Sequence, residues 1–127
     1  GKLVQAFVEE EGVSEAMQEF VNPLADLGDK VNKLTTELGM KAFQNPDEVG
    51  GAAVDYLRVC GHLVFAYFFA RAAKIALDKK DSGDPFYTAK LATARFYFAK
   101  LLPETAGLIR SARTGVAPLL AMDEALF

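Results

Sequence analysis

The chain has 127 residues, a length that fits one domain able to bury a core without disulfides or metals. Its formal charge is -3 and its longest basic run is Lys79-Lys80, which argues against nucleic acid or an anionic membrane surface as a partner. The single cysteine, Cys60, excludes an internal disulfide and favours a cytoplasmic location. Hydrophobic residues make up 51% of the chain, which suggests a second buried surface facing a partner or another domain.

Helical periodicity is the main signal in the first third of the chain. We expect a short helix over residues 3–10 and a long helix from about Ser14 to Phe43, because apolar residues at a 3-4 spacing share one helix stripe. Pro23 interrupts the long run, so either Asn22 caps a new helix or one longer helix kinks there. The predicted buried stripe consists of Met17, Phe20, Leu24, Leu27, Val31, Leu34 and Leu38.

A capping asparagine and a first-turn proline at Asn45-Pro46 predict the start of the second long helix. It should run to about Lys80 and end near Gly83. The twelve residues between Arg58 and Arg71 are almost all apolar, but too few to span a bilayer, which needs about 20. We therefore expect a core helix buried on both sides. Its inner stripe is predicted as Val54, Leu57, Gly61, Val64, Phe68, Ala72 and Ile75, and its opposite side as Val59, Phe65, Ala66, Phe69 and Ala73.

A third long helix is predicted from Asp84-Pro85, again a cap followed by proline, to Thr114-Gly115. Pro103 falls inside it and should bend it, because proline removes one backbone hydrogen bond. Residues 116–127 are expected to form a short terminal helix or a hooked tail. The predicted core stripe is Tyr87, Leu91, Ala94, Phe98, Leu101, Thr105, Leu108 and Ala112.

Three long helices joined by short turns must run antiparallel to their neighbours. The predicted fold is therefore all-α, an antiparallel up-and-down four-helix bundle with short terminal helices, in a single domain over residues 1–127.

Residues that could form an active site are scarce in this sequence. The one histidine, His62, has Val59 three residues before it, so the Glu-x-x-His pairs of a di-iron bundle are missing, and one His with one Cys cannot complete a zinc site. Gly50-Gly51 lacks the lysine of a phosphate-binding loop. No carboxylate lies in the predicted core stripes, where burial could make it a catalytic base. We expect no catalytic, cofactor-binding or metal-binding residue in this chain.

Several cations and aromatic residues interrupt or flank the apolar helices and are candidates for an interface. Each cation, Lys90 included, could pair with an acid of a neighbouring helix, or could meet a carboxylate or phosphate of an adjoining domain. A second possibility is a ligand slot in which two phenylalanines and the nearby arginines hold an acyl chain or a CoA phosphate, and a third is an adaptor that binds a partner helix. The candidate residues are Arg58, His62, Phe65, Phe69, Arg71 and Arg95.

Several segments together resemble the C-terminal-like domain of acyl-CoA dehydrogenases. The most specific is Lys90-x-x-Thr93-Ala94-Arg95-Phe96-Tyr97 with Leu101-Leu102-Pro103 after it. The resemblance is also carried by Phe86-Tyr87, by Tyr56-Leu57 with Gly61, by Ala70-Arg71-Ala72-Ala73 and by the tail Ala121 to Phe127.

This resemblance implies that the chain is the C-terminal fragment of a longer flavoenzyme. The parent would use FAD to oxidise an acyl-CoA to an enoyl-CoA, with its carboxylate base and its flavin in upstream domains. The fragment would then be non-catalytic and hold no cofactor. Its partners would be the upstream dehydrogenase domains of the same chain or of a neighbouring subunit in a homo-oligomer, with no nucleic acid and no membrane span.

Overall fold

The computed structural model describes residues 1–115 and residue 121, and within them the chain is helical and has no β-strand. The all-α class is therefore confirmed. The elements are α1 (Lys2–Glu11), the 3₁₀ turn η1 (Glu15–Met17), α2 (Gln18–Gln44), α3 (Asp47–Asp78), the 3₁₀ turn η2 (Lys80–Ser82), α4 (Pro85–Phe96), the π-helical segment η3 (Tyr97–Leu101) and α5 (Glu104–Thr114). The expected terminal helix or tail over 116–127 lies outside the described residues, apart from residue 121.

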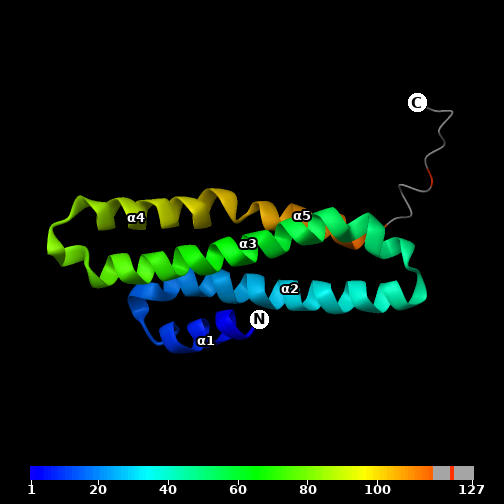
Figure 1. The fold of residues 1–127 in the computed structure, drawn as a ribbon, viewed down its shortest axis with the longest axis horizontal. Helices are drawn as coiled ribbons and strands as arrows, with labels where there is room; N and C mark the ends of the chain where they lie inside the picture. Colours follow the sequence, from blue (N-terminus) through cyan, green and yellow to red (C-terminus); the bar gives the residue numbers. More distant parts are fainter. Residues whose placement is uncertain (116–120, 122–127) are drawn as a thin grey trace, which may run out of the picture.

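The helices lie side by side in alternating directions, with α1 next to α2 and α3 between α2 and the rod formed by α4 and α5 (Figure 1). On one side of α3, α2 also contacts the α4–α5 rod. The ring of Phe20 on α2 packs edge-on against Phe98 in η3, with 5.6 Å between centroids, and Glu37 on α2 pairs with Arg113 on α5 at 2.8 Å. As a result, one face of α3 is enclosed by the core and the opposite face is left bare.

α2 follows its predicted pattern. It is one helix across Pro23, preceded by the short turn η1, so the alternative in which a new helix starts at Asn22 is wrong. Every member of the predicted stripe is buried, except that Leu38 is partly buried. The polar residues between them face water, as the helical period requires.

Both predicted helix starts are confirmed to within about a residue, with Pro46 at the N-cap of α3 and Asp84 at that of α4. The Oδ1 atom of Asn45 accepts a hydrogen bond from the backbone N–H of Asp47 at 3.2 Å, and Oδ1 of Asp84 accepts one from Phe86 at 2.9 Å. Between α3 and α4 the chain turns at Gly83, whose φ of +80° is costly for any residue with a side chain.

The assignment of faces on α3 was wrong. Val59, Ala66 and Ala73, predicted for the opposite side, are fully buried, whereas the predicted inner stripe points outward and Leu57 is 69% exposed. Both faces are apolar, so periodicity could not tell them apart. The physical reason for the outcome is size: small side chains let α2 and the α4–α5 rod approach α3 closely.

The α4–α5 rod is bent at Pro103, as predicted, but the bend takes the form of a π-helical segment. The N–H of Leu102 bonds to the carbonyl of Tyr97 at 2.9 Å, five residues back. A wider turn moves the carbonyl of Ala99 away from the proline ring, which would clash with it in an α-helix. The extra residue shifts the core register, so that Tyr97 and Leu102 are buried and the predicted Leu101 is exposed.

The length of α3 was predicted well, but its apolar stretch was underestimated by counting only the run between Arg58 and Arg71. By length and composition alone, Val49–Asp78 is long and apolar enough to cross a membrane, and only 28% of its most apolar part is buried. Core helices of soluble proteins pass the same test, so this property by itself assigns no membrane location.

Candidate interface and the contacts of His62

His62 is joined to Tyr97, the first residue of the π-helical segment. The Tyr97 hydroxyl lies 2.9 Å from Nδ1 of His62 and 2.9 Å from the backbone carbonyl oxygen of the same residue. The tyrosine is 3% exposed, and burial raises its pKa to about 12. The phenol therefore stays protonated at neutral pH and donates its one hydrogen to α3.

The other ring nitrogen of His62 faces Glu104, in the first turn of α5. Nε2 lies 3.0 Å from Oε2 of Glu104, and the other carboxylate oxygen pairs with the guanidinium of Arg58. The hydrogen bond from His62, together with the charge of Arg58, holds the pKa of Glu104 below its usual range. Because a carboxylate only accepts hydrogen bonds, Nε2 must carry the hydrogen in this pair.

These four residues, Arg58, His62, Tyr97 and Glu104, form a polar seam that fastens α3 to the α4–α5 rod. A Tyr–His–Glu chain has the parts of a proton relay, but the Tyr97 hydroxyl is enclosed and both of its contacts go to His62. A substrate would have no access to that oxygen. The geometry therefore favours a structural role for His62 over a chemical one.

The aromatic candidates separate into an inner and an outer residue. Phe69 is partly buried and stacks on the ring of Tyr97, with centroids 4.6 Å apart and planes 19° apart. Phe65 lies one turn earlier on α3 but points outward, and 58% of its surface is exposed. The two phenylalanines thus belong to different surfaces, and only Phe65 is placed to meet a partner.

The arginines follow the pairing alternative in two of three cases. Arg58 pairs with Glu104, and Nε of Arg95 bonds to Glu19 on α2 at 2.8 Å. Arg71 instead lies over the ring of Tyr67, 5.6 Å from its centroid. Lys90 lies over the ring of Phe86 in the same way, at 5.3 Å. Within the described residues, Arg58 and Arg95 thus pair with acids, whereas Arg71 and Lys90 contact aromatic rings.

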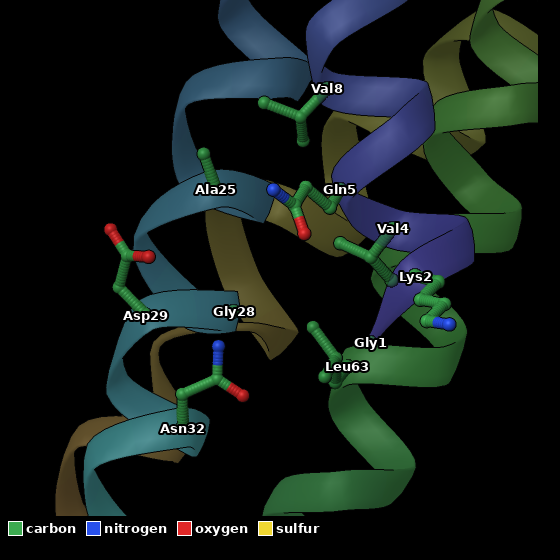
Figure 2. Close-up of a pocket in the computed structure, with 10 residues that line it drawn as sticks. All are labelled: Gly1, Lys2, Val4, Gln5, Val8, Ala25, Gly28, Asp29, Asn32 and Leu63. Atoms are coloured by element: carbon green, nitrogen blue, oxygen red, sulfur yellow. The ribbon is translucent and has the colours of Figure 1, made fainter.

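A pocket of about 410 Å³ lies at α1 (Figure 2). Its polar wall includes the amides of Gln5 and Asn32, and Leu63 from α3 closes one side. A second groove of about 290 Å³ between α2 and α3 is almost entirely apolar and includes Tyr56 and Leu57. Neither contains a candidate interface residue, so these two pockets give no support to a ligand slot built on them. The α1 pocket is lined by Gly1, Lys2, Val4, Gln5, Val8, Ala25, Gly28, Asp29, Asn32 and Leu63.

Sequence reasoning did not single out Tyr97 or Glu104 as partners of His62. The available signal was Pro103, which predicts a distortion in that stretch of helix, and π-helical turns often occur at functional positions. The distortion also explains why a 3.6-residue period misplaces Tyr97.

The architecture and the polar seam define an all-helical chain whose helices are held together by their own contacts. Comparison with protein families identifies its class: residues 1–123 match the model described as acetyl-CoA dehydrogenase C-terminal like. The chain therefore belongs to this family, and the predicted resemblance is confirmed. Among curated proteins, none matches the chain.

Proposed function

We propose that this chain is the non-catalytic C-terminal packing and assembly domain of a cytoplasmic, FAD-dependent acyl-CoA dehydrogenase. Family membership supports the class of the parent protein. The observation that carries the assembly role is the bare apolar face of α3, which we call the outer stripe. It consists of Val54, Leu57, Gly61, Val64, Phe65, Phe68, Ala72 and Ile75.

The outer stripe is unusual in having larger side chains than the buried face of the same helix. Ala66, Ala70 and Ala73 face the core, whereas Phe65 and Phe68 face outward and are both more than half exposed. Burying apolar surface stabilises by roughly 25 cal/mol per Å². In the single chain, the large side chains of the outer stripe stay exposed and therefore add little to stability. Contiguous exposed patches of this kind mark protein–protein contact sites.

The domain that we propose is an antiparallel up-and-down bundle whose four members are α1, α2, α3 and the α4–α5 rod. In this arrangement α3 is packed on one face by the rest of the bundle. Its outer stripe is then available for a contact within the assembly.

The proposed division of labour places the chemistry in the upstream domains. The flavin, the carboxylate base and the acyl-CoA would be held there, and the enclosed seam around His62 and Tyr97 supports a purely structural contribution from this chain. Six residues are proposed for contacts in the assembly: Arg58, His62, Phe65, Phe69, Arg71 and Arg95. Of these, Phe65 is the one on the outer stripe, and the others would act at its edges or by holding α3 in place.

The decisive experiment compares the parent protein with a version that lacks the 127 residues of this chain. We expect both to bind FAD and to bleach the flavin on addition of an acyl-CoA in a single turnover. The shortened protein should sediment as a smaller assembly. Loss of flavin reduction with the assembly unchanged would contradict the proposal.

A second test uses the 127-residue chain alone. Isothermal titration with FAD and with a medium-chain acyl-CoA should show no binding at micromolar concentration. Micromolar binding of either compound would instead favour the helical ligand-binding module.

A further inference from the structure

We propose that two copies of this chain pair through their outer stripes, with the two α3 helices antiparallel. The two-fold axis would cross the stripe between Val64 and Phe65. This inference rests on the proposed assembly role and names the partner: a second copy of this chain. It commits the outer stripe to that partner, so the dehydrogenase domains would contact the bundle elsewhere.

The positions of the outer stripe are symmetric along α3. Its eight residues are placed symmetrically about the midpoint between Val64 and Phe65, so reversal of the helix maps the set of positions onto itself. In an antiparallel pair, the two-fold axis places Val64 and Phe65 at the centre, each beside the same residue of the second copy. Moving outward, Gly61 faces Phe68, Leu57 faces Ala72 and Val54 faces Ile75. A two-fold interface requires such self-complementarity, because the same patch is used by both copies.

The side chains of the two stripes also match in size along the pair. At two of the four levels a large side chain faces a small one, Phe68 against Gly61 and Leu57 against Ala72. A Cβ atom built on Gly61 would meet nothing within 4 Å in the single chain, so the space over this glycine is open. The ring of Phe68 from the second copy would occupy that space. The 3-4 spacing of the stripe is also the spacing with which helices interlock at small crossing angles.

The exposed apolar area of the outer stripe also supports pairing. The six largest side chains of the stripe are each more than half exposed, which leaves roughly 600 Å² of apolar surface bare. Two such surfaces in contact would bury about 1,200 Å², the lower bound for specific protein–protein interfaces. The area is therefore sufficient for a specific pair.

The charges near the stripe do not oppose this pairing. Arg58 and Arg71 lie at matching levels, but at 100° per residue they fall on opposite edges of the stripe. The two-fold axis keeps each arginine on its own edge, so guanidinium groups of the two copies do not meet. Arg58 is also already neutralised by Glu104.

The test uses the full 127-residue chain in sedimentation velocity over a range of concentrations. The unmodified chain should shift from monomer to dimer as concentration rises. Phe68→Glu should raise the dissociation constant at least about 100-fold, because pairing would bury an unpaired charge at a central contact. Phe86→Glu is the matched control: Phe86 is 55% exposed against 57% for Phe68, but lies on α4 outside the stripe, and its replacement should leave the dimer unchanged.

Gly61→Leu gives an independent variant that keeps the surface apolar. In the single chain the new side chain enters open space and removes a flexible glycine from a helix, so circular dichroism should show a fully folded protein. In the pair it would collide with Phe68 of the second copy, so the dimer should be lost. A dimer that persists in Gly61→Leu would overturn the antiparallel register.

Cysteine cross-linking then fixes the direction of the helices. In a Cys60→Ala background, mixing Val54→Cys with Ile75→Cys should give a disulfide-linked heterodimer under mild oxidation, and Val54→Cys alone should not. Cross-linking of Val54→Cys to itself would indicate a parallel pair and would refute the proposal. An unmodified chain that stays monomeric at every concentration would also refute it. In that case the role as a packing domain still depends on the separate truncation and titration experiments.

Discussion

Tyr97 is the residue on which the contact between α3 and the α4–α5 rod depends most. Its hydroxyl is shared between two atoms of His62, its ring stacks on Phe69, and it is nearly inaccessible to water. A buried hydrogen bond adds only modestly to the free energy of unfolding. Removing the hydroxyl costs more, because the buried groups that it contacted then lack a partner and cannot reach water. The stability of the seam should therefore respond to the loss of a single oxygen atom.

Tyr97→Phe is expected to lower the free energy of unfolding by about 1–2 kcal/mol, since the ring is kept and only the hydrogen bonds are lost. Urea denaturation followed by circular dichroism measures the difference. Tyr87→Phe is the control, because within residues 1–115 the hydroxyl of Tyr87 makes no hydrogen bond, and its change should be within about 0.5 kcal/mol. Equal losses in the two variants would show that the seam contributes nothing.

Glu104 should give the protein a specific dependence on pH. The hydrogen bond from His62 and the nearby charge of Arg58 lower its pKa in the folded state relative to its ordinary value of 4.5. The unfolded chain then takes up the proton first as pH falls. The stability that Glu104 contributes is therefore fully present above pH 4.5 and is lost as pH falls through the lower folded pKa.

Glu104→Gln should consequently be less stable than the unmodified chain at pH 7, and the difference should shrink as pH falls below 4.5. Denaturation curves at a series of pH values provide the measurement. Asp29→Asn, which alters an exposed carboxylate on α2, serves as the reference. A difference that stays constant down to the acid limit would be inconsistent with the His62 contact.

Among the elements, the π-helical segment decides the register of the rod. It contains one inserted residue relative to an α-helix, and this insertion allows Tyr97 and Leu102 to share the core side. Its presence follows from Pro103, whose ring cannot lie close to the carbonyl four residues earlier.

Deleting Lys100 together with Pro103→Ala should convert the segment to a regular α-helix and leave the buried residues on their present side. Lys100 is exposed, so the loss of its side chain should cost little stability. The variant should fold, with a loss of at most about 2 kcal/mol. Thermal and urea denaturation give the measurement.

The control deletes Ala106 in the same Pro103→Ala background. Ala106 is equally exposed, but it lies in regular α-helix, so its deletion rotates Leu108, Ile109 and Ala112 by about 100° out of the core. This should cost several kcal/mol or prevent folding. If both deletions are equally damaging, the π-helical segment does not act as an inserted residue.

For the molecule as a whole, α2 and α3 distribute their large side chains in opposite ways. In α2 the large residues are inside, and Phe20 is 1% exposed, whereas in α3 the large residues of the outer stripe are outside. The core is therefore built from the large residues of α2 and the small residues of α3. Identical substitutions on the two helices should have very different effects.

Phe20→Ala should lower the free energy of unfolding by about 3–5 kcal/mol, because it opens a cavity beside Phe98. Phe65→Ala, measured at a concentration where the chain is monomeric, should change it by no more than about 0.5 kcal/mol. Urea denaturation of both variants tests this difference directly. A large loss for Phe65→Ala in the monomer would mean that the outer stripe packs within the chain.

Much of the fold could be predicted from the sequence because its signals are local. The caps at Asn45 and Asp84 fix where helices begin, and the periodic apolar residues of α2 identify its buried face. The turn at Gly83 and the bend at Pro103 follow from backbone stereochemistry. The family was equally accessible, since the segment ending in Tyr97 carries it.

The seam and the orientation of α3 required the tertiary structure. His62 meets Glu104 only because a π-helical turn rotates the start of α5, and no local period encodes a rotation of that kind. The sequence by itself determined that α3 is apolar on both sides. Only the packing decided which side is inside, because close contact with two neighbouring helices selects small residues, and the larger ones of α3 face outward.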